Sequence, residues 1–158
     1  MKANAIEIIA RGVCVQDGRM LLCHGKGAAN TYLPGGHIEF AESAATSLGR
    51  ELVEELGVKA RVGRFLGAVE HTYWRKEQIC EVNLVFEFQA AGLDPRHAPP
   101  SREGHIEFLW VPLNGLRKAK LEPAPLGTLL PQWVRTRKAS PAWASTYGNP
   151  ARGTRNAE

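Results

Sequence analysis

The sequence of 158 residues has few cysteines and no long hydrophobic run. Its three cysteines lie in apolar stretches and show no C-x-x-C spacing, which argues against a disulfide framework and a cysteine-based zinc site. No apolar run approaches the ~18–20 residues that a membrane-spanning helix needs. Glu7 and Arg11 interrupt the apolar N-terminal stretch, which argues against a signal peptide. These features predict a cytoplasmic protein without a membrane partner.

The main part of the chain carries no excess of positive charge, although the formal net charge of the whole chain is +4. Residues 1–130 are neutral overall, and the excess positive charge comes from residues 131–158. We expect one domain at residues 1–137, long enough for a single hydrophobic core. Residues 138–158 are rich in Ser, Gly, Pro and Ala, and we expect them to form a basic, flexible C-terminal tail.

The first half of the chain contains a hairpin signal and a clear strand signal. Strand-like runs on both sides of Asp17 and Gly18 predict a β-hairpin. Residues 80–88 alternate between apolar and polar side chains. The alternation predicts a strand that buries its apolar face and turns Glu81 and Glu87 either to solvent or to a substrate cleft.

The second half adds a loop, a strand and two short helices. Proline and glycine predict a loop over residues 91–105, and residues 106–113 read as a strand. A short helix is expected within residues 113–118. A second is expected within residues 124–136, where Pro131 should interrupt it. Strands combined with a long middle helix predict an α/β fold with a mixed sheet covered by helices.

Residues 42–56 carry the helical pattern. Apolar residues recur there at i, i+3, i+7 and i+11, which is one stripe of an α-helix. The stripe consists of Ala45, Leu48, Leu52 and Leu56. Gly57 fits a left-handed stop after the helix. Gly49 is unfavourable inside a helix by roughly 1 kcal/mol relative to Ala, which suggests that another group packs closely against it.

The same stretch, GGHIEFAESAATSLGRELVEELGV at residues 35–58, contains five glutamates, only one arginine, Arg50, and no lysine. Glu51, Glu54 and Glu55 are three or four residues apart and project to one flank of the helix. Crowded carboxylates raise one another's proton affinity unless a cation neutralises them. Mg²⁺ is held by carboxylates together with substrate phosphates. We therefore interpret the glutamates as a metal site, with Arg50 holding Glu54 or another member in place.

At every fixed position this stretch is similar to the Nudix box. The matching residues are Gly36, Glu42, Arg50, Glu51, Leu52, Glu54, Glu55, Gly57 and Val58. The resemblance extends over about residues 5–130. It implies an α/β/α sandwich with a mixed β-sheet, in which the box forms a loop, a helix and a loop. It also implies hydrolysis of a nucleoside diphosphate linked to another group, X, with Mg²⁺ or Mn²⁺ as the cofactor.

The resemblance assigns roles to individual residues. The positions that match metal ligands are Glu51, Glu54, Glu55 and the main-chain carbonyl of Gly35. Glu42 and Arg50 match positions that orient the metal-binding glutamates. Members of the family often recruit another carboxylate from a later loop, for which Glu103 is the first candidate and Glu107 the second.

Catalysis requires a base, and binding requires contacts to the substrate. A carboxylate has to remove a proton from the attacking water, and Glu54 and Glu103 are both candidates. Tyr73 or Trp74 could stack on the nucleobase of a substrate. Lys26 or Arg75 could meet phosphates.

Three functions stay open at the level of the sequence. The first is hydrolysis of a nucleoside triphosphate or related small nucleotide by a monomer or homodimer. Residues 58–94 contain no proline of the kind that marks the ADP-ribose branch, which favours this substrate class. The second is a catalytically silent Nudix-fold nucleotide sensor, which should have lost a carboxylate of the box. The third is an RNA 5′-end pyrophosphohydrolase that uses the basic tail, although nucleic acid is the less favoured partner.

Overall fold

The structure is a computed structural model that describes residues 5–136 and 143–145. Its helices and strands follow one another in this order: β1 (Ile6–Val13), β2 (Val15–Gln16), β3 (Arg19–Gly25), β4 (Thr31–Tyr32), β5 (Gly35–His37), α1 (Ala44–Leu56), β6 (Ala60–Trp74), β7 (Gln78–Ala90), β8 (Ile106–Pro112), the 3₁₀-helix η1 (Leu113–Gly115), β9 (Leu121–Glu122), α2 (Leu126–Arg135) and β10 (Trp143–Ser145).

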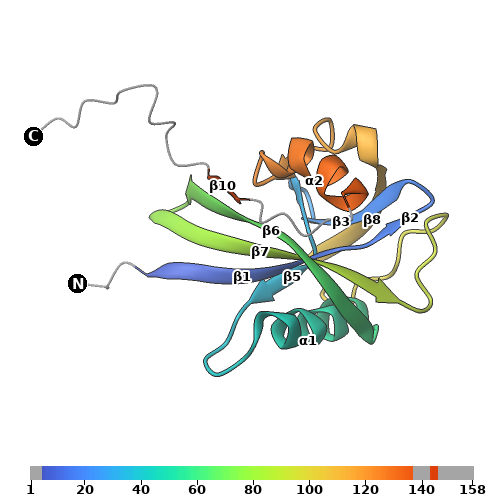
Figure 1. Ribbon diagram of the computed structural model, residues 1–158, viewed down its shortest axis with the longest axis horizontal. Coiled ribbons are helices and arrows are strands. Elements are labelled where there is room, and N and C mark those ends of the chain that lie inside the picture. Colours follow the sequence, from blue (N-terminus) through green and yellow to red (C-terminus); the bar gives the residue numbers. More distant parts are fainter. Residues whose placement is uncertain (1–4, 137–142, 146–158) are drawn as a thin grey trace, which may run out of the picture.

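Two β-sheets form the middle of the molecule. The first has the strand order β10-β6-β7-β1-β5, and it is mixed because β1 runs parallel to β7 but antiparallel to β5. The second has the order β2-β3-β4-β9, and β8 pairs antiparallel with β3. In Figure 1, α1 lies below the long strands and α2 lies above them. The arrangement confirms the predicted α/β fold with a mixed sheet between helices.

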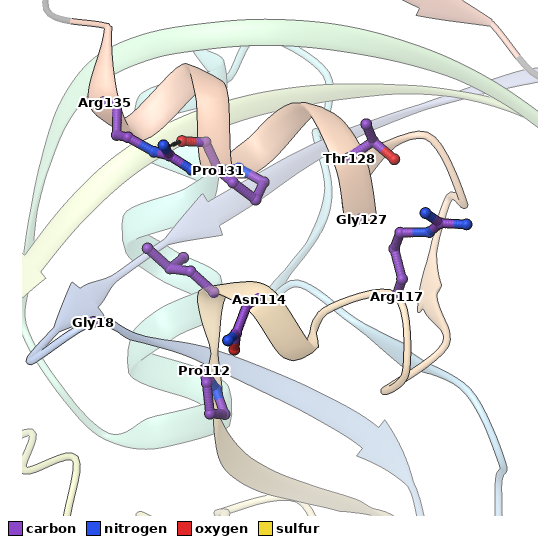
Figure 2. Close-up of a pocket in the computed structure, with 9 residues that line it drawn as sticks. Gly18, Pro112, Asn114, Arg117, Gly127, Thr128, Pro131 and Arg135 are labelled. Atoms are coloured by element: carbon purple, nitrogen blue, oxygen red, sulfur yellow. Dashed lines mark hydrogen bonds between the residues drawn. The ribbon is translucent and has the colours of Figure 1, made fainter.

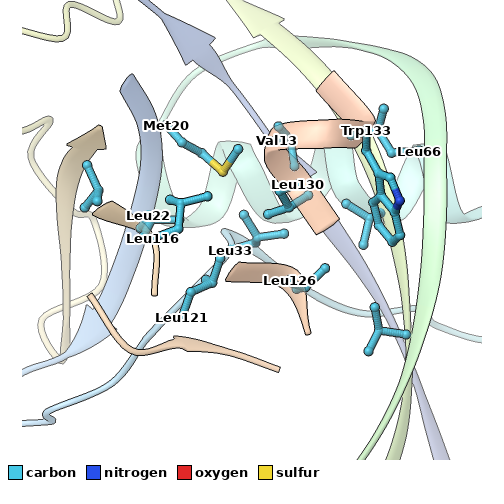
Figure 3. Close-up of a cluster of buried hydrophobic side chains, with 13 residues drawn as sticks. Val13, Met20, Leu22, Leu33, Leu66, Leu116, Leu121, Leu126, Leu130 and Trp133 are labelled. Atoms are coloured by element: carbon cyan, nitrogen blue, oxygen red, sulfur yellow. The ribbon is translucent and has the colours of Figure 1, made fainter. Parts of the chain in front are cut away.

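Two hydrophobic cores hold these layers together. One lies beneath α2, where Leu126, Leu130 and Trp133 pack against strand residues such as Val13 and Leu66 (Figure 3). The other lies between α1 and the strands. There Leu48, Leu52 and Leu56 pack against side chains from both sheets, including Ala10, Leu21, Phe88 and Phe108. No helix in the described ranges is long and apolar enough to cross a membrane.

The predicted hairpin and helix boundaries are present. Asp17 and Gly18 both have positive φ, 47° and 70°, as a tight turn between β2 and β3 requires. The Ser43 side chain accepts a hydrogen bond from the Thr46 amide and caps the start of α1. Gly57 ends the helix with a φ of 70°, which confirms the left-handed stop.

Two details of the α1 prediction are wrong. Ala45 is exposed, and Ala44 packs against the core in its place. An i, i+4 step from Ala44 to Leu48 continues the buried stripe as well as an i, i+3 step does. A Cβ added at Gly49 would meet nothing within 4 Å, so no group packs against this glycine.

The predicted burial of β7 is confirmed at Phe88, which is 2% exposed, but is reversed in the first part of the strand. There Glu81, Asn83 and Val85 are buried, at 5%, 0% and 0% exposure, whereas the apolar residues that alternate with them are only half-buried. The polar face is buried because it points into the interior between the two sheets, where it meets Arg11 of β1. Period-2 alternation separates the two faces of a strand but does not say which face is covered.

The C-terminal part differs from the prediction at Pro131. Pro131 lies inside α2, which continues to Arg135 rather than breaking. Burial of Leu130 and Trp133 on both sides of the proline stabilises the helix, as tertiary packing often does. Of the predicted flexible tail, the structure describes only Trp143–Ser145, which form β10 and pair parallel with β6. The rest of that prediction lies outside the described residues.

Candidate active site

Helix α1 presents the three candidate metal ligands at very different depths. Its leucines face the core, which turns the glutamate flank toward the β5 segment. The Glu55 residue is only 4% exposed, whereas the side chains of Glu51 and Glu54 are 16% and 50% exposed. The three carboxylates thus run from the protein interior to the solvent along one flank.

Arg50 binds several of the box carboxylates at once. Its guanidinium donates two hydrogen bonds of 3.0 Å to Glu42, one of 2.9 Å to Glu51 and one of 3.2 Å to Glu54. It also donates to the main-chain carbonyl of His37 at 3.1 Å. The two bonds from Arg50 lower the pKa of Glu42 to about 2, which keeps this carboxylate ionised. Arg50 therefore holds Glu42, Glu51 and Glu54 together, while the orienting roles of Arg50 and Glu42 toward a metal site stay a prediction.

Glu55 is a buried carboxylate held by the backbone of β5. Its Oε2 accepts a hydrogen bond of 3.1 Å from the Gly35 amide. Burial raises the pKa of Glu55 to about 7 and outweighs the lowering effect of that amide and of Arg11. The negative charges of Glu51 and Glu103 contribute to the rise. Such a group is stabilised by a nearby cation, which would offset the loss of hydration.

Gly35 lets the β5 backbone approach β1, and Gly36 lets it approach the Glu51 carboxylate of α1. Gly35 has a φ of 124°, and a Cβ there would lie 2.1 Å from the Ala10 carbonyl oxygen. A Cβ at Gly36 would lie 2.4 Å from the carboxylate carbon of Glu51. Only glycine fits at position 35, whereas a side chain at position 36 would force the Glu51 carboxylate to move. The Gly35 carbonyl, a predicted metal ligand, accepts a hydrogen bond of 3.1 Å from Arg11.

The donor set fits a hard divalent cation by its chemistry. Three carboxylates and one carbonyl are the oxygen ligands that Mg²⁺ prefers. In the described part of the chain, no three His, Cys, Asp or Glu side chains converge as a ready-made cation site. Arg50 binds Glu51 and Glu54, and the Gly35 amide binds Glu55. The residues that could hold the ion therefore lie along one flank of α1 and on β5, each bound to a donor from the protein, and they do not converge in this arrangement.

The predicted extra carboxylate, Glu103, lies on a loop that is attached to α1. The amide of Arg102 donates a hydrogen bond of 2.8 Å to the main-chain carbonyl of Glu55. The Arg102 guanidinium packs over Gly57 at the end of the helix. Glu103 is near enough for its charge to affect the pKa of Glu55. The second candidate, Glu107, instead pairs with His24 at 3.3 Å.

A cleft of about 640 Å³ lies between the two sheets near these residues. It is lined by Arg11, Gly25, Ala28, Asn30, Tyr32, His71, Tyr73, Arg75, Glu81, His105, Glu122 and Pro123. Its volume suits a small organic ligand. Arg11 links this cleft to the box, because one guanidinium binds the Gly35 carbonyl and also Asn83 of β7.

Some of the predicted substrate-binding residues line this cleft and others do not. Tyr73 and Arg75 line it, whereas Lys26 is exposed and is not among the lining residues, although its neighbour Gly25 is. Trp74 is 74% exposed and also lies outside the lining. Sequence reasoning did not single out Arg11 or Asn83 as functional candidates. The one available signal was the position of a charged and an amide residue within apolar strand runs.

A second cavity, of about 560 Å³, contains no carboxylate. Figure 2 shows it between η1 and α2. Its lining consists of Gly18, Pro112, Leu113, Asn114, Arg117, Gly127, Thr128, Pro131 and Arg135. Two arginines without an acidic partner in the lining cannot hold a cation, so this cavity does not compete with the box as a metal site.

The comparisons with known proteins agree with this geometry. The NUDIX domain model matches residues 7–132. No significant match was found among curated protein sequences. Among solved structures, the solution structure of the E. coli ORF135 protein is similar with a TM-score of 0.65 and 22% identity, over 85% of this chain and 95% of that chain.

Two MutT proteins are also similar. The MutT NUDIX hydrolase from Burkholderia pseudomallei has a TM-score of 0.56 and 25% identity, over 69% of this chain and 84% of that chain. The MutT protein from Methanosarcina mazei has a TM-score of 0.59 and 23% identity, over 82% and 91% of the two chains. The family model covers the whole site, from β1 to α2. The chain therefore belongs to the NUDIX family and is a hydrolase that acts on phosphoric anhydrides.

Proposed function

We propose that this hydrolase cleaves a nucleoside diphosphate linked to X, preferably a nucleoside triphosphate or related small nucleotide, in the cytoplasm with Mg²⁺ or Mn²⁺. The observation that carries the proposal is the complete set of box carboxylates around β5. Glu55 is buried against the Gly35 amide, and Glu51 packs over Gly36. A silent sensor has no need to retain every carboxylate, and this chain retains all of them.

Glu51, Glu54, Glu55 and the Gly35 carbonyl are the residues that would hold the cation. When bound, a divalent cation neutralises phosphate oxygens and increases the acidity of water. Arg50 keeps Glu51 and Glu54 on the side of the helix that faces β5. The Gly35 amide keeps Glu55 oriented. These contacts fix the carboxylates before the substrate arrives, so little reorganisation is needed during the reaction.

The proton of the attacking water has two possible acceptors in this chain. Glu54 is half exposed and has one oxygen, Oε1, that Arg50 does not bind. Glu103 lies near Glu55, and its Oε2 is 3.4 Å from His105 Nε2. Water attacks phosphorus, the carboxylate takes its proton, and the anhydride P–O bond breaks to release a phosphorylated leaving group. Comparison of Glu54→Gln with Glu103→Gln decides which carboxylate acts as the base.

The proposal is tested with a panel of substrates in ¹⁸O-labelled water with Mg²⁺. The panel contains nucleoside triphosphates, oxidised nucleotides, ADP-ribose, dinucleoside polyphosphates and nucleotide sugars. We expect hydrolysis of the triphosphates to a monophosphate and pyrophosphate, with one labelled oxygen in a phosphate product. Faster hydrolysis of ADP-ribose or a nucleotide sugar would replace the preferred substrate. Failure to hydrolyse any member would contradict the proposed function.

A further inference from the structure

The cleft beside the box contains a buried carboxylate that the proposed hydrolysis does not use. Glu81 of β7 is 5% exposed and lines the cleft. A buried charged group is costly unless it is paired or hydrogen-bonded. Glu81 belongs to none of the ion pairs found among the described residues. Its burial is therefore offset by hydrogen bonding rather than by an opposite charge.

A directional chain of hydrogen bonds orients this carboxylate. Arg11 Nε donates to Asn83 Oδ1 at 3.1 Å, and Asn83 Nδ2 donates to Glu81 Oε1 at 3.0 Å. Arginine has no acceptor, so the Asn83 carbonyl has to face Arg11 and its amide nitrogen has to face Glu81. Asn83 itself is fully buried. The geometry thus fixes Glu81 as a hydrogen-bond acceptor.

The second carboxylate oxygen, Oε2, is left for a ligand. No donor in residues 5–136 and 143–145 binds it, yet no buried side-chain oxygen or nitrogen of these residues lacks a partner. A fully buried Oε2 without a partner would contradict the second statement, so Oε2 retains accessible surface on a residue that lines the cleft. A ligand that fills the cleft therefore meets an oriented acceptor and has to bring N–H or O–H donors to it.

The same carboxylate decides which part of a nucleotide lies beside it. Negative phosphates are repelled by Glu81 and belong at the box, where the cation would neutralise them. An aromatic pair, His71 and Tyr73, stacks on the wall of the cleft, with ring centroids 5.2 Å apart and planes at 24°. Aromatic side chains on a cleft wall suit the flat face of a nucleobase. The Glu81 carboxylate and the His71–Tyr73 pair together therefore suit the nucleobase of a nucleotide rather than its phosphates.

We propose that Glu81 is a specificity-determining residue that binds a nucleobase with two adjacent N–H donors, the arrangement that guanine presents at N1 and its 2-amino group. The inference rests on the proposed function, since it concerns the nucleotide whose phosphates the box would hold. Oε2, together with the lone pair of Oε1 that the Asn83 amide does not use, matches two adjacent donors in the way that carboxylates accept from base amino groups. Uracil and adenine place an acceptor next to their donor at this edge, which opposes an acceptor on the protein. Asn83 and Arg11 act as positioning residues for Glu81.

The test compares kcat/KM for GTP, ITP, ATP and UTP with Mg²⁺. The variants are Glu81→Gln and, as a matched control, Glu77→Gln, which removes the same charge from the exposed β6–β7 turn outside the cleft lining. A site built on hydrogen bonds to a substrate N–H strongly rejects analogues that lack it. We expect the wild type to prefer GTP over ATP and UTP at least ~100-fold. In Glu81→Gln we expect the kcat/KM for GTP to fall at least ~10-fold, with UTP changed less than ~3-fold, while Glu77→Gln keeps the wild-type preference.

ITP provides a test that needs no variant, because it lacks only the 2-amino group of guanine. The wild type should use ITP at least ~10-fold less efficiently than GTP, since one of the two donors is missing. Equal use of the bases by the wild type would overturn the inference and leave the proposed function intact. An unchanged GTP preference in a folded Glu81→Gln variant would overturn it too. Failure to hydrolyse any nucleotide would contradict the proposed function itself, and this inference with it.

Discussion

Replacing Glu55 by Gln should stabilise the metal-free protein at neutral and alkaline pH. Glu55 is 4% exposed and accepts a hydrogen bond from the Gly35 amide, which the amide oxygen of glutamine can also accept. Burial raises the pKa of this carboxyl from its ordinary value of 4.5 to about 7. A difference of this size corresponds to about 3 kcal/mol between the protonated and ionised forms. The substitution removes that penalty with little change of shape.

The sign of the effect follows from proton binding. Because the folded state binds this proton more tightly than the unfolded chain, Glu55 destabilises the fold as the pH rises from about 4.5 to about 7. Below that window the carboxyl is protonated in both states and the penalty is absent. The free energy of unfolding of Glu55→Gln should therefore exceed that of the wild type by about 3 kcal/mol more at pH 8 than it does at low pH.

Urea unfolding in EDTA between pH 4.5 and 8.5 measures this gap. Glu54→Gln is the matched control, because the Glu54 side chain is half exposed and stays hydrated, so its stability should run parallel to that of the wild type. Saturating Mg²⁺ should stabilise the wild type more than Glu55→Gln and narrow the gap at pH 8. A gap that does not change with pH in EDTA would refute the reasoning.

Three further predictions concern the support of the site. Arg50→Lys should reduce apparent Mg²⁺ affinity or turnover about 10- to 100-fold, because lysine cannot bind Glu42 and Glu51 with a fork of donors; a Mg²⁺ titration of activity measures this. Gly36→Ala should lower turnover at least ~10-fold in steady-state kinetics, because the added Cβ displaces the Glu51 carboxylate. Gly49→Ala, whose added Cβ meets nothing within 4 Å, should keep the wild-type turnover and raise the free energy of unfolding in urea by roughly 1 kcal/mol. Deletion of residues 138–158 should leave hydrolysis of small nucleotides intact, while loss of that activity would favour a role for the tail.

Local signals account for the parts of the structure that the sequence predicted correctly. The β2–β3 turn depends on two residues with positive φ, and α1 depends on a serine cap and a glycine stop. Each of these features is encoded within a few neighbouring residues. The helical spacing likewise places Glu51, Glu54 and Glu55 on one flank without knowledge of the fold.

Features that depend on distant contacts were mispredicted or missed. Burial of Glu81 requires Asn83 to be bound by Arg11, a residue 72 positions away in the chain. Continuation of α2 through Pro131 depends on the core that Leu130 and Trp133 enter. The same limit applies to the cleft, whose walls come from both sheets and from loops between them. Tertiary packing decides all of these, and local propensity does not.

The most direct test of the account is Mg²⁺-dependent hydrolysis by the wild type and by Glu54→Gln and Glu55→Gln. The central claim is that the box carboxylates bind the cation and support removal of a proton from water. We expect wild-type hydrolysis of a nucleoside triphosphate to stop in EDTA and return with Mg²⁺. Each variant should be slowed at least ~100-fold while remaining folded by circular dichroism. Near-normal rates with Mg²⁺ in both variants would contradict the central claim.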